Sequence, residues 1–194
     1  SSAGTNFTSA AEDCVVIGSF AAGSAGTSAS GVIAIGSKAG RSNTATGTMS
    51  IGFQSGYTQT SGAGNTNIGY EAGYSNSTNG SRTTVGYQAG KFHTGSLSTF
   101  LGYQAGLGVS SSSVGTQNTG VGRTALTALT SGAYNTALGS AAGNAITSGT
   151  SNVVIGRSSA GSLNTGSNNI VIGHNANVSS GSVDNEITLG DANI

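Results

Sequence analysis

Proline and tryptophan are absent from this 194-residue chain, and charged residues make up only 6% of it. Disordered chains usually carry a high net charge or abundant proline, whereas this chain has a formal net charge of zero and a regular supply of Val, Ile and Leu. With 34 glycines, the composition also departs from that of an ordinary globular domain. These features indicate a chain whose order comes from repetition.

Long hydrophobic runs are missing as well. No run approaches the length of a transmembrane helix, and residues 1–14 contain neither the basic nor the apolar region of a signal peptide. We therefore expect no membrane insertion. The single cysteine, Cys14, cannot form an internal disulfide. The chain also begins without Met, so we expect it to be a piece of a longer protein.

A glycine-centred phrase recurs along the whole chain, as in NTNIGYEAG, TTVGYQAG and TFLGYQAG. Aligned on the glycine that follows an aliphatic residue, the intervals are 18, 16, 17, 17, 16, 20, 17, 17, 17 and 17 residues. The period is therefore 17, with one insertion within residues 107–120. We expect one repeat array over residues 1–194, with a lead-in at 1–13, central coils at 14–183 and a terminal coil at 184–194. The anchor glycines are Gly18, Gly36, Gly52, Gly69, Gly86, Gly102, Gly122, Gly139, Gly156, Gly173 and Gly190.

The residues before each anchor glycine predict a short β-strand. The first and third residues before it, Ile17 and Val15 in the first repeat, are aliphatic or Thr and share one face of a strand. We predict that this pair points inward. A small residue three positions after the glycine, such as Ala72, predicts a second inward position, and a further glycine such as Gly73 predicts a turn of positive φ. The third position before the anchor forms a Thr column in the middle repeats: Thr66, Thr83, Thr99, Thr119 and Thr136.

Seventeen residues are too few for a helical repeat but enough for one coil of a β-solenoid. We therefore predict an all-β fold, a repetitive β-solenoid or β-roll of about eleven 17-residue coils. Coils stacked about 4.8 Å apart would form a rod on the order of 50 Å long. Stacking also predicts an Asn ladder that satisfies turn and backbone polar groups: Asn65, Asn118, Asn135, Asn152 and Asn169.

The core of a single chain would be thin, because each coil supplies only about two aliphatic residues and an alanine. The position between the inward pair is also apolar in several coils, and we expect it to form an outward stripe that needs a partner. The simplest association is a parallel homotrimer. The stripe comprises Val16, Ala34, Phe100, Ala137, Val154 and Val171.

The repeats GVIAIGSKAG, SNVVIGRSSAG and NNIVIGHNANV resemble the left-handed β-roll in heads of YadA-type trimeric autotransporter adhesins. The GYQAG repeats and the ending SGSVDNEITLGDANI more closely resemble bacteriophage tail-fibre and tailspike shafts, in which such a segment precedes a C-terminal intramolecular chaperone domain. The resemblance implies a structural segment of a virion tail fibre or spike that supports host-cell attachment. The alternative is a bacterial trimeric surface adhesin head. The 17-residue period is longer than that of the adhesin heads, and the chaperone domain itself is not in this sequence.

Catalytic and metal-binding patterns are missing. A glycosidase needs two carboxylates in one cleft, yet five of the six acidic residues lie in the end coils and only Glu71 lies centrally. His93 and His174 are isolated from any Cys or second His, so neither is expected to bind a metal ion. We therefore expect no metal, no cofactor and no enzymatic activity. The basic residues are too widely spread for nucleic-acid binding. The other acidic residues are Glu12, Asp13, Asp184, Glu186 and Asp191.

An aromatic row follows the anchor glycine in four consecutive coils: Phe53, Tyr70, Tyr87 and Tyr103. Tyrosine rows bind sugars through ring faces and hydroxyls, so this row, with Gln88 and Gln104 beside it, is a candidate contact for host cell-surface polysaccharide. The more conservative interpretation is a packing ladder. A different alternative is ice binding by the Thr column, which its predicted inward direction disfavours.

Overall fold

The computed structural model describes residues 13–23, 29–76, 78–109 and 113–191. Within these ranges the chain is all-β and contains no helix, so no helix there is long and apolar enough to cross a membrane. Residues 1–12 of the predicted lead-in, including Glu12, lie outside the described ranges. The strands are β1 (Val15–Ile17), β2 (Ile33–Ile35), β3 (Met49–Ile51), β4 (Thr66–Ile68), β5 (Thr83–Val85), β6 (Thr99–Leu101), β7 (Thr119–Val121), β8 (Thr136–Leu138), β9 (Val153–Ile155), β10 (Ile170–Ile172) and β11 (Ile187–Leu189).

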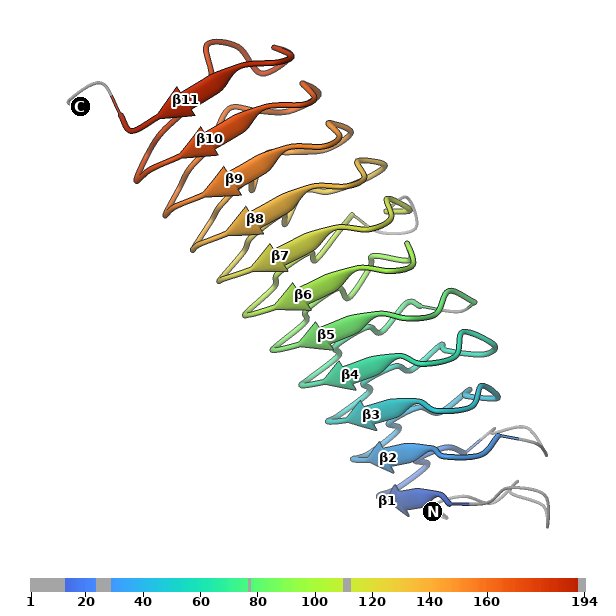
Figure 1. Ribbon diagram of the computed structural model, residues 1–194. Helices are drawn as coiled ribbons and strands as arrows, with labels where there is room; N and C mark the ends of the chain where they lie inside the picture. Colours follow the sequence, from blue (N-terminus) through green and yellow to red (C-terminus); the bar gives the residue numbers. More distant parts are fainter. Residues whose placement is uncertain (1–12, 24–28, 77, 110–112, 192–194) are drawn as a thin grey trace.

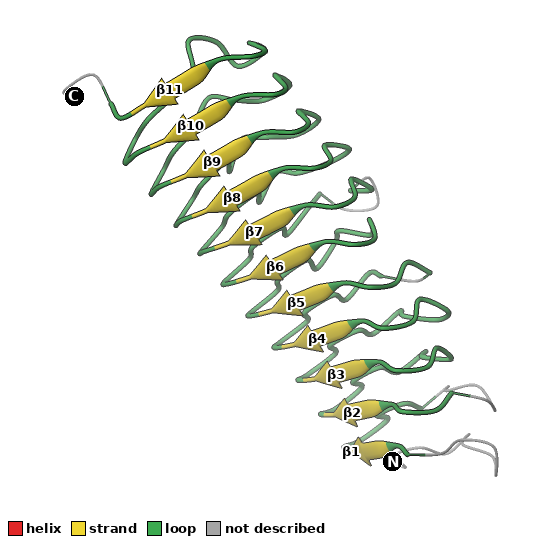
Figure 2. Ribbon diagram, viewed as in Figure 1, coloured by secondary structure: helices red, strands yellow, loops and turns green. Residues whose placement is uncertain are grey.

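The eleven strands form one parallel sheet in chain order, with one strand per coil of a β-solenoid (Figure 1). Each strand pairs in register with the next, so that Thr66 lies beside Thr83 and Ile68 beside Val85. Turns and loops complete each coil (Figure 2). We number the coils by their strands, each coil beginning one residue before its strand. The predicted β-solenoid and its period are confirmed, and the insertion leaves the register intact, since Thr99 pairs with Thr119.

The anchor glycines are required for two separate reasons. Gly69 and Gly86 have φ values of 130° and 133°, which L side chains rarely adopt. A Cβ at either position would also lie 2.4 Å from the carbonyl oxygen of the next anchor glycine. The backbone of each anchor glycine therefore lies directly against that of the next, and no larger residue fits at this position.

The strand faces are the reverse of the prediction. The central residue of each strand points into the coil, and Ala34, Phe100, Val154 and Val171 are fully buried. The flanking pair points outward, so that Ile17 is among the exposed large hydrophobic residues. The predicted outward stripe is therefore interior, and the predicted inward pair lines the outer face of the sheet.

The narrowness of the coil explains this reversal. The central strand residue faces the second glycine of the turn, and a Cβ on Gly106 would lie 2.2 Å from the ring of Phe100. The predicted small inward position is confirmed, because Ala72, Ala89 and Ala105 are fully buried. The second glycines also have the predicted positive φ, for example 59° at Gly73. The inward side chain of each strand therefore packs directly against the turn on the opposite side of the coil, as Phe100 does against Gly106.

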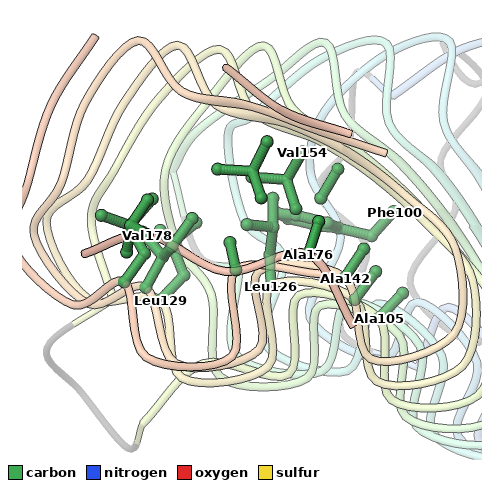
Figure 3. Close-up of a cluster of buried hydrophobic side chains, with 14 of the residues drawn as sticks. Phe100, Ala105, Leu126, Leu129, Ala142, Val154, Ala176 and Val178 are labelled. Atoms are coloured by element: carbon green, nitrogen blue, oxygen red, sulfur yellow. The ribbon is translucent and has the colours of Figure 1, made fainter. Parts of the chain in front are cut away.

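The interior changes its chemistry along the rod. An apolar cluster extends from Ala89 and Phe100 to Val178 (Figure 3), and a smaller one fills the first two coils. Between them, coils 3–5 (residues 48–97) contain a largely polar interior. Its buried polar and charged side chains include Ser50, Gln59, Asn65, Asn67, Asn76, Arg82, Thr84 and His93.

Candidate functional site: the outer sheet face and the aromatic stacks

The outer face of the sheet carries two columns of side chains, one from the first and one from the third residue of every strand. None of these residues is charged. The third-residue column is aliphatic in all eleven coils, and Ile17, Leu101, Leu138 and Leu189 are 45–65% exposed. We call these two columns the outer sheet face. A continuous exposed apolar strip of this kind marks an interaction surface.

The Thr column lies on this outer face, which overturns the predicted inward direction. Thr99, Thr119 and Thr136 are exposed, and Thr66 and Thr83 are partly exposed. In-register pairing sets the five hydroxyl-bearing side chains at the strand spacing, about 4.8 Å apart. Because the Thr column points outward, its direction does not disfavour ice binding.

The predicted aromatic row is a continuous stack. The ring centroids of Phe53, Tyr70, Tyr87 and Tyr103 are 5.3, 5.1 and 5.2 Å apart in successive pairs, and their planes differ by 7–18°. Nearly parallel rings at this distance lie face over face. The four residues are 39–48% exposed. Because the inner ring faces cover one another, solvent meets ring edges and the three tyrosine hydroxyls.

A second stack, missed by the sequence analysis, lies five residues after the anchor glycines. The rings of Tyr57 and Tyr74 are 4.9 Å apart and differ by 1° in plane. Arg41 lies 5.5 Å from the centroid of Tyr57, and Lys91 lies 5.8 Å from that of Tyr74. A cation thus covers each end of a tyrosine pair. Arg41, Tyr57, Tyr74 and Lys91 follow one another at intervals of 16, 17 and 17 residues, and this spacing could have predicted the second stack from the sequence.

A polar ladder accompanies the first stack. Gln104 donates to Gln88 over 2.9 Å, Gln88 donates to Glu71 over 2.8 Å, and Lys91 pairs with Glu71 at 2.6 Å. Partial burial acts to raise the pKa of Glu71, but the hydrogen bonds from Lys91 and Gln88 and the charge of Lys91 outweigh it and lower that pKa. The predicted glycan-contacting amides of Gln88 and Gln104 therefore already take part in hydrogen bonds within the rod.

Two acidic residues near the C-terminal coil accept hydrogen bonds from neighbouring groups of the chain. Asp184 accepts from the backbone N–H of Ser167 over 2.6 Å, and Glu186 accepts from Ser179 and Thr188. These hydrogen bonds lower the pKa of Glu186. In the described ranges no group of three His, Cys, Asp or Glu side chains could hold a metal ion. The predicted lack of enzymatic activity remains a prediction.

Two of the basic and imidazole side chains lie inside the rod. Arg82 and His93 have no exposed surface, and Arg82 occupies the position before its strand that Asn holds in the ladder coils. The guanidinium donates to the carbonyl oxygens of His93 and Gly90. The predicted Asn ladder is present from Asn118 to Asn169, where each side-chain oxygen accepts the backbone N–H one coil later.

Comparison with protein-family models, with curated proteins and with solved structures found no match. The candidate surfaces therefore rest on the geometry described above.

Proposed function

We propose that this chain is a structural segment of a virion tail fibre or spike, which supports host-cell attachment and associates side by side as a parallel homotrimer. The observation that carries the proposal is the outer sheet face, which is uncharged and unbroken over all eleven strands. A stack of eleven coils is a rod by construction, and rods of this kind suit a spacer better than a reaction site.

A second copy of the chain fits this face for geometric reasons. Ten coil steps of about 4.8 Å by three strand residues of about 3.3 Å give a footprint on the order of 500 Å². Stable interfaces bury about 800 Å² per partner, so the strip forms the apolar centre of the association and the side chains beside it complete each contact. Two parallel copies have the same coil step, and their columns therefore match along the whole length.

Sedimentation equilibrium tests the association. We expect the wild-type chain to form trimers at micromolar concentration and a Leu138→Lys/Ile172→Lys variant to sediment as a folded monomer, because charges would oppose burial of the face. Thr165→Lys is the matched control, since Thr165 is exposed in a loop outside the sheet. A folded wild-type monomer at that concentration would contradict the homotrimer.

A bacterial trimeric surface adhesin head remains the close alternative, because it would use the same rod and the same association. The coding sequence next to this segment distinguishes them. A chaperone domain after Ile194 supports the fibre, and a membrane anchor supports the adhesin.

Ice binding is a second candidate function, favoured by the outward Thr column on an in-register parallel sheet. It requires the outer sheet face to be free of partners, whereas the homotrimer covers it. Thermal hysteresis measured on the wild-type chain, together with its loss in a Thr83→Val/Thr99→Val/Thr119→Val variant, would establish it. No thermal hysteresis from a monomeric preparation would rule it out.

The stacked aromatic row is our proposed contact for host polysaccharide, through hydroxyls and ring edges rather than ring faces. A Tyr70→Phe/Tyr87→Phe/Tyr103→Phe variant removes the hydroxyls and keeps the stack, as Phe53 does naturally. We expect this variant to lose polysaccharide binding with its oligomeric state unchanged. Equal binding by both proteins would leave the row as packing only.

A further inference from the structure

The least satisfied part of the rod interior lies in coils 4 and 5. Four buried side-chain atoms of the described residues have no hydrogen-bond partner: Asn76 Oδ1, Arg82 Nε, His93 Nδ1 and His93 Nε2. Buried polar atoms without partners are rare, and each one destabilises the folded state. The four atoms belong to three residues of two neighbouring coils, so the unsatisfied polar groups are concentrated in one part of the rod.

Among the described residues, no carboxylate lies against the ring of His93 to balance a positive charge. Its ring lies edge-on against Phe100 at 4.9 Å, and its backbone forms a parallel bridge with Ser113. The guanidinium of Arg82 lies beside it, bonded to the carbonyl oxygen of His93. The other nearby charges, Lys91 and Glu71, pair with each other, and Lys91 lies over aromatic rings. A protonated His93 would therefore be a second buried cation beside Arg82.

We propose that Arg82 and His93 make residues 82–100 an acid-sensitive opening point in the rod: protonation of His93 opens this segment locally while the apolar-cored coils 8–10 remain closed. The inference is independent of the fibre proposal, because it concerns the interior of one chain. Coils 8–10 provide the internal reference, since Ile146 in coil 8 and Leu163 in coil 9 occupy the position of His93 and are fully buried.

The pKa values agree with this geometry. Burial, the largest cause, and the charge of Arg82 together lower the pKa of His93 to about 3, while the backbone of Gly115 acts in the opposite direction. Burial also lowers the pKa of Arg82 to about 10, so Arg82 stays charged at neutral pH. Because the folded-state pKa of His93 lies below the unfolded value of 6.5, stability is complete above pH 6.5 and falls as the pH drops toward 3.

Hydrogen–deuterium exchange of the full chain, corrected for intrinsic rates, tests the proposal at pH 7.5 and pH 5.0. This window stays above the range in which Glu71 is protonated. We expect the opening equilibrium over residues 82–100 to rise on the order of 30-fold, as a shift of this size requires. Residues 135–172 should change little. An equal response of both regions, or none in either, would overturn the proposal.

Variants assign the response to His93. His93→Gln, which copies Gln59 at the same position two coils earlier, should remove the pH response of residues 82–100. His174→Gln is the matched control, because His174 is exposed and contacts only Arg157 in the described hydrogen bonds. If His93→Gln responds to pH as the wild type does, the assignment to His93 is wrong.

Discussion

Coils 3–5 and coils 8–10 follow the same backbone path, but different interactions stabilise them. In coils 8–10 the interior is filled by the fully buried side chains of Ile146, Val154, Leu163 and Val171. The positions after their anchor glycines carry Ser140, Arg157 and His174, which form no ring stack. In coils 3–5 the interior is polar, and stacked aromatic rings cover the outside.

The polar interior is held by hydrogen bonds between side chains. Thr84 donates to Asn67 over 2.8 Å, and Asn67 donates to Gln59 over 3.1 Å. Each such bond contributes about 1 kcal/mol net, whereas a buried Ile or Leu contributes about 1.5–3 kcal/mol. The four stacked aromatic pairs outside add about 0.5–1.5 kcal/mol each. The comparison shows that the glycines and coil-to-coil hydrogen bonds set the path, while the source of stability varies along it.

The largest expected effect is that of a charge in the apolar interior. Val154→Asp should destabilise the fold by about 4 kcal/mol or more, because the carboxylate would have no partner inside the coil. Urea unfolding followed by circular dichroism measures this loss. Thr165→Asp, in an exposed loop outside the sheet, should leave the unfolding free energy within about 1 kcal/mol. A folded but dissociated Val154→Asp protein would support the outward direction predicted from the sequence.

Removal of one ring tests whether the outer stacks stabilise the polar coils. Tyr87→Ala breaks two stacked pairs and should destabilise coils 4–6 by about 2 kcal/mol. Ser140→Ala, at the equivalent position of coil 8, should change stability by less than about 0.5 kcal/mol. Hydrogen exchange resolves the two regions. Equal small effects of both substitutions would show that the stacks do not stabilise the rod.

The sequence was sufficient to predict every strand, because the 17-residue period and the anchor glycine occur in each coil. It did not predict which strand face is buried, since both faces carry apolar residues and alternation alone does not distinguish them. The width of the coil, set by glycines such as Gly106 against Phe100, decides that question. The sequence analysis also did not predict the burial of Arg82 and His93. A single polar residue at a repeated position does not indicate whether its side chain points into the coil or outward. The aromatic row was predicted, but its stacking geometry depends on side-chain rotation.

A smaller effect, a gain in stability, is expected when an apolar residue replaces a polar one in the interior of coils 3–5. Asn76→Leu removes the partnerless Oδ1, and the carbonyl oxygen of Asn79 keeps its hydrogen bond from Asn65. The variant should be neutral or more stable by about 1 kcal/mol, measured by thermal or urea unfolding. Asn65→Leu is the contrasting variant and should destabilise, because it removes three hydrogen bonds of Asn65, to the carbonyl oxygens of Gly62 and Asn79 and from the backbone N–H of Arg82. A large loss in Asn76→Leu would mean that coils 4 and 5 cannot accept an apolar interior.

The smallest expected effect belongs to the ion pair on the outside of the polar coils. Glu71→Gln removes the charge that Lys91 and Gln88 stabilise, and partly exposed pairs contribute less than about 1 kcal/mol. Because the folded-state pKa of Glu71 is lowered, its contribution is present above the unfolded value of 4.5 and is lost as the pH falls through the folded value. Stability curves from pH 7 to pH 3 should therefore differ between wild type and Glu71→Gln mainly at the upper end and converge in acid. Asp184→Asn, at the other end of the rod, should leave the acid response of coils 4–6 as it is in the wild type. Curves that stay parallel down to pH 3 would show that this ion pair adds nothing to the stability of the polar coils, and that the stacked rings alone support them from outside.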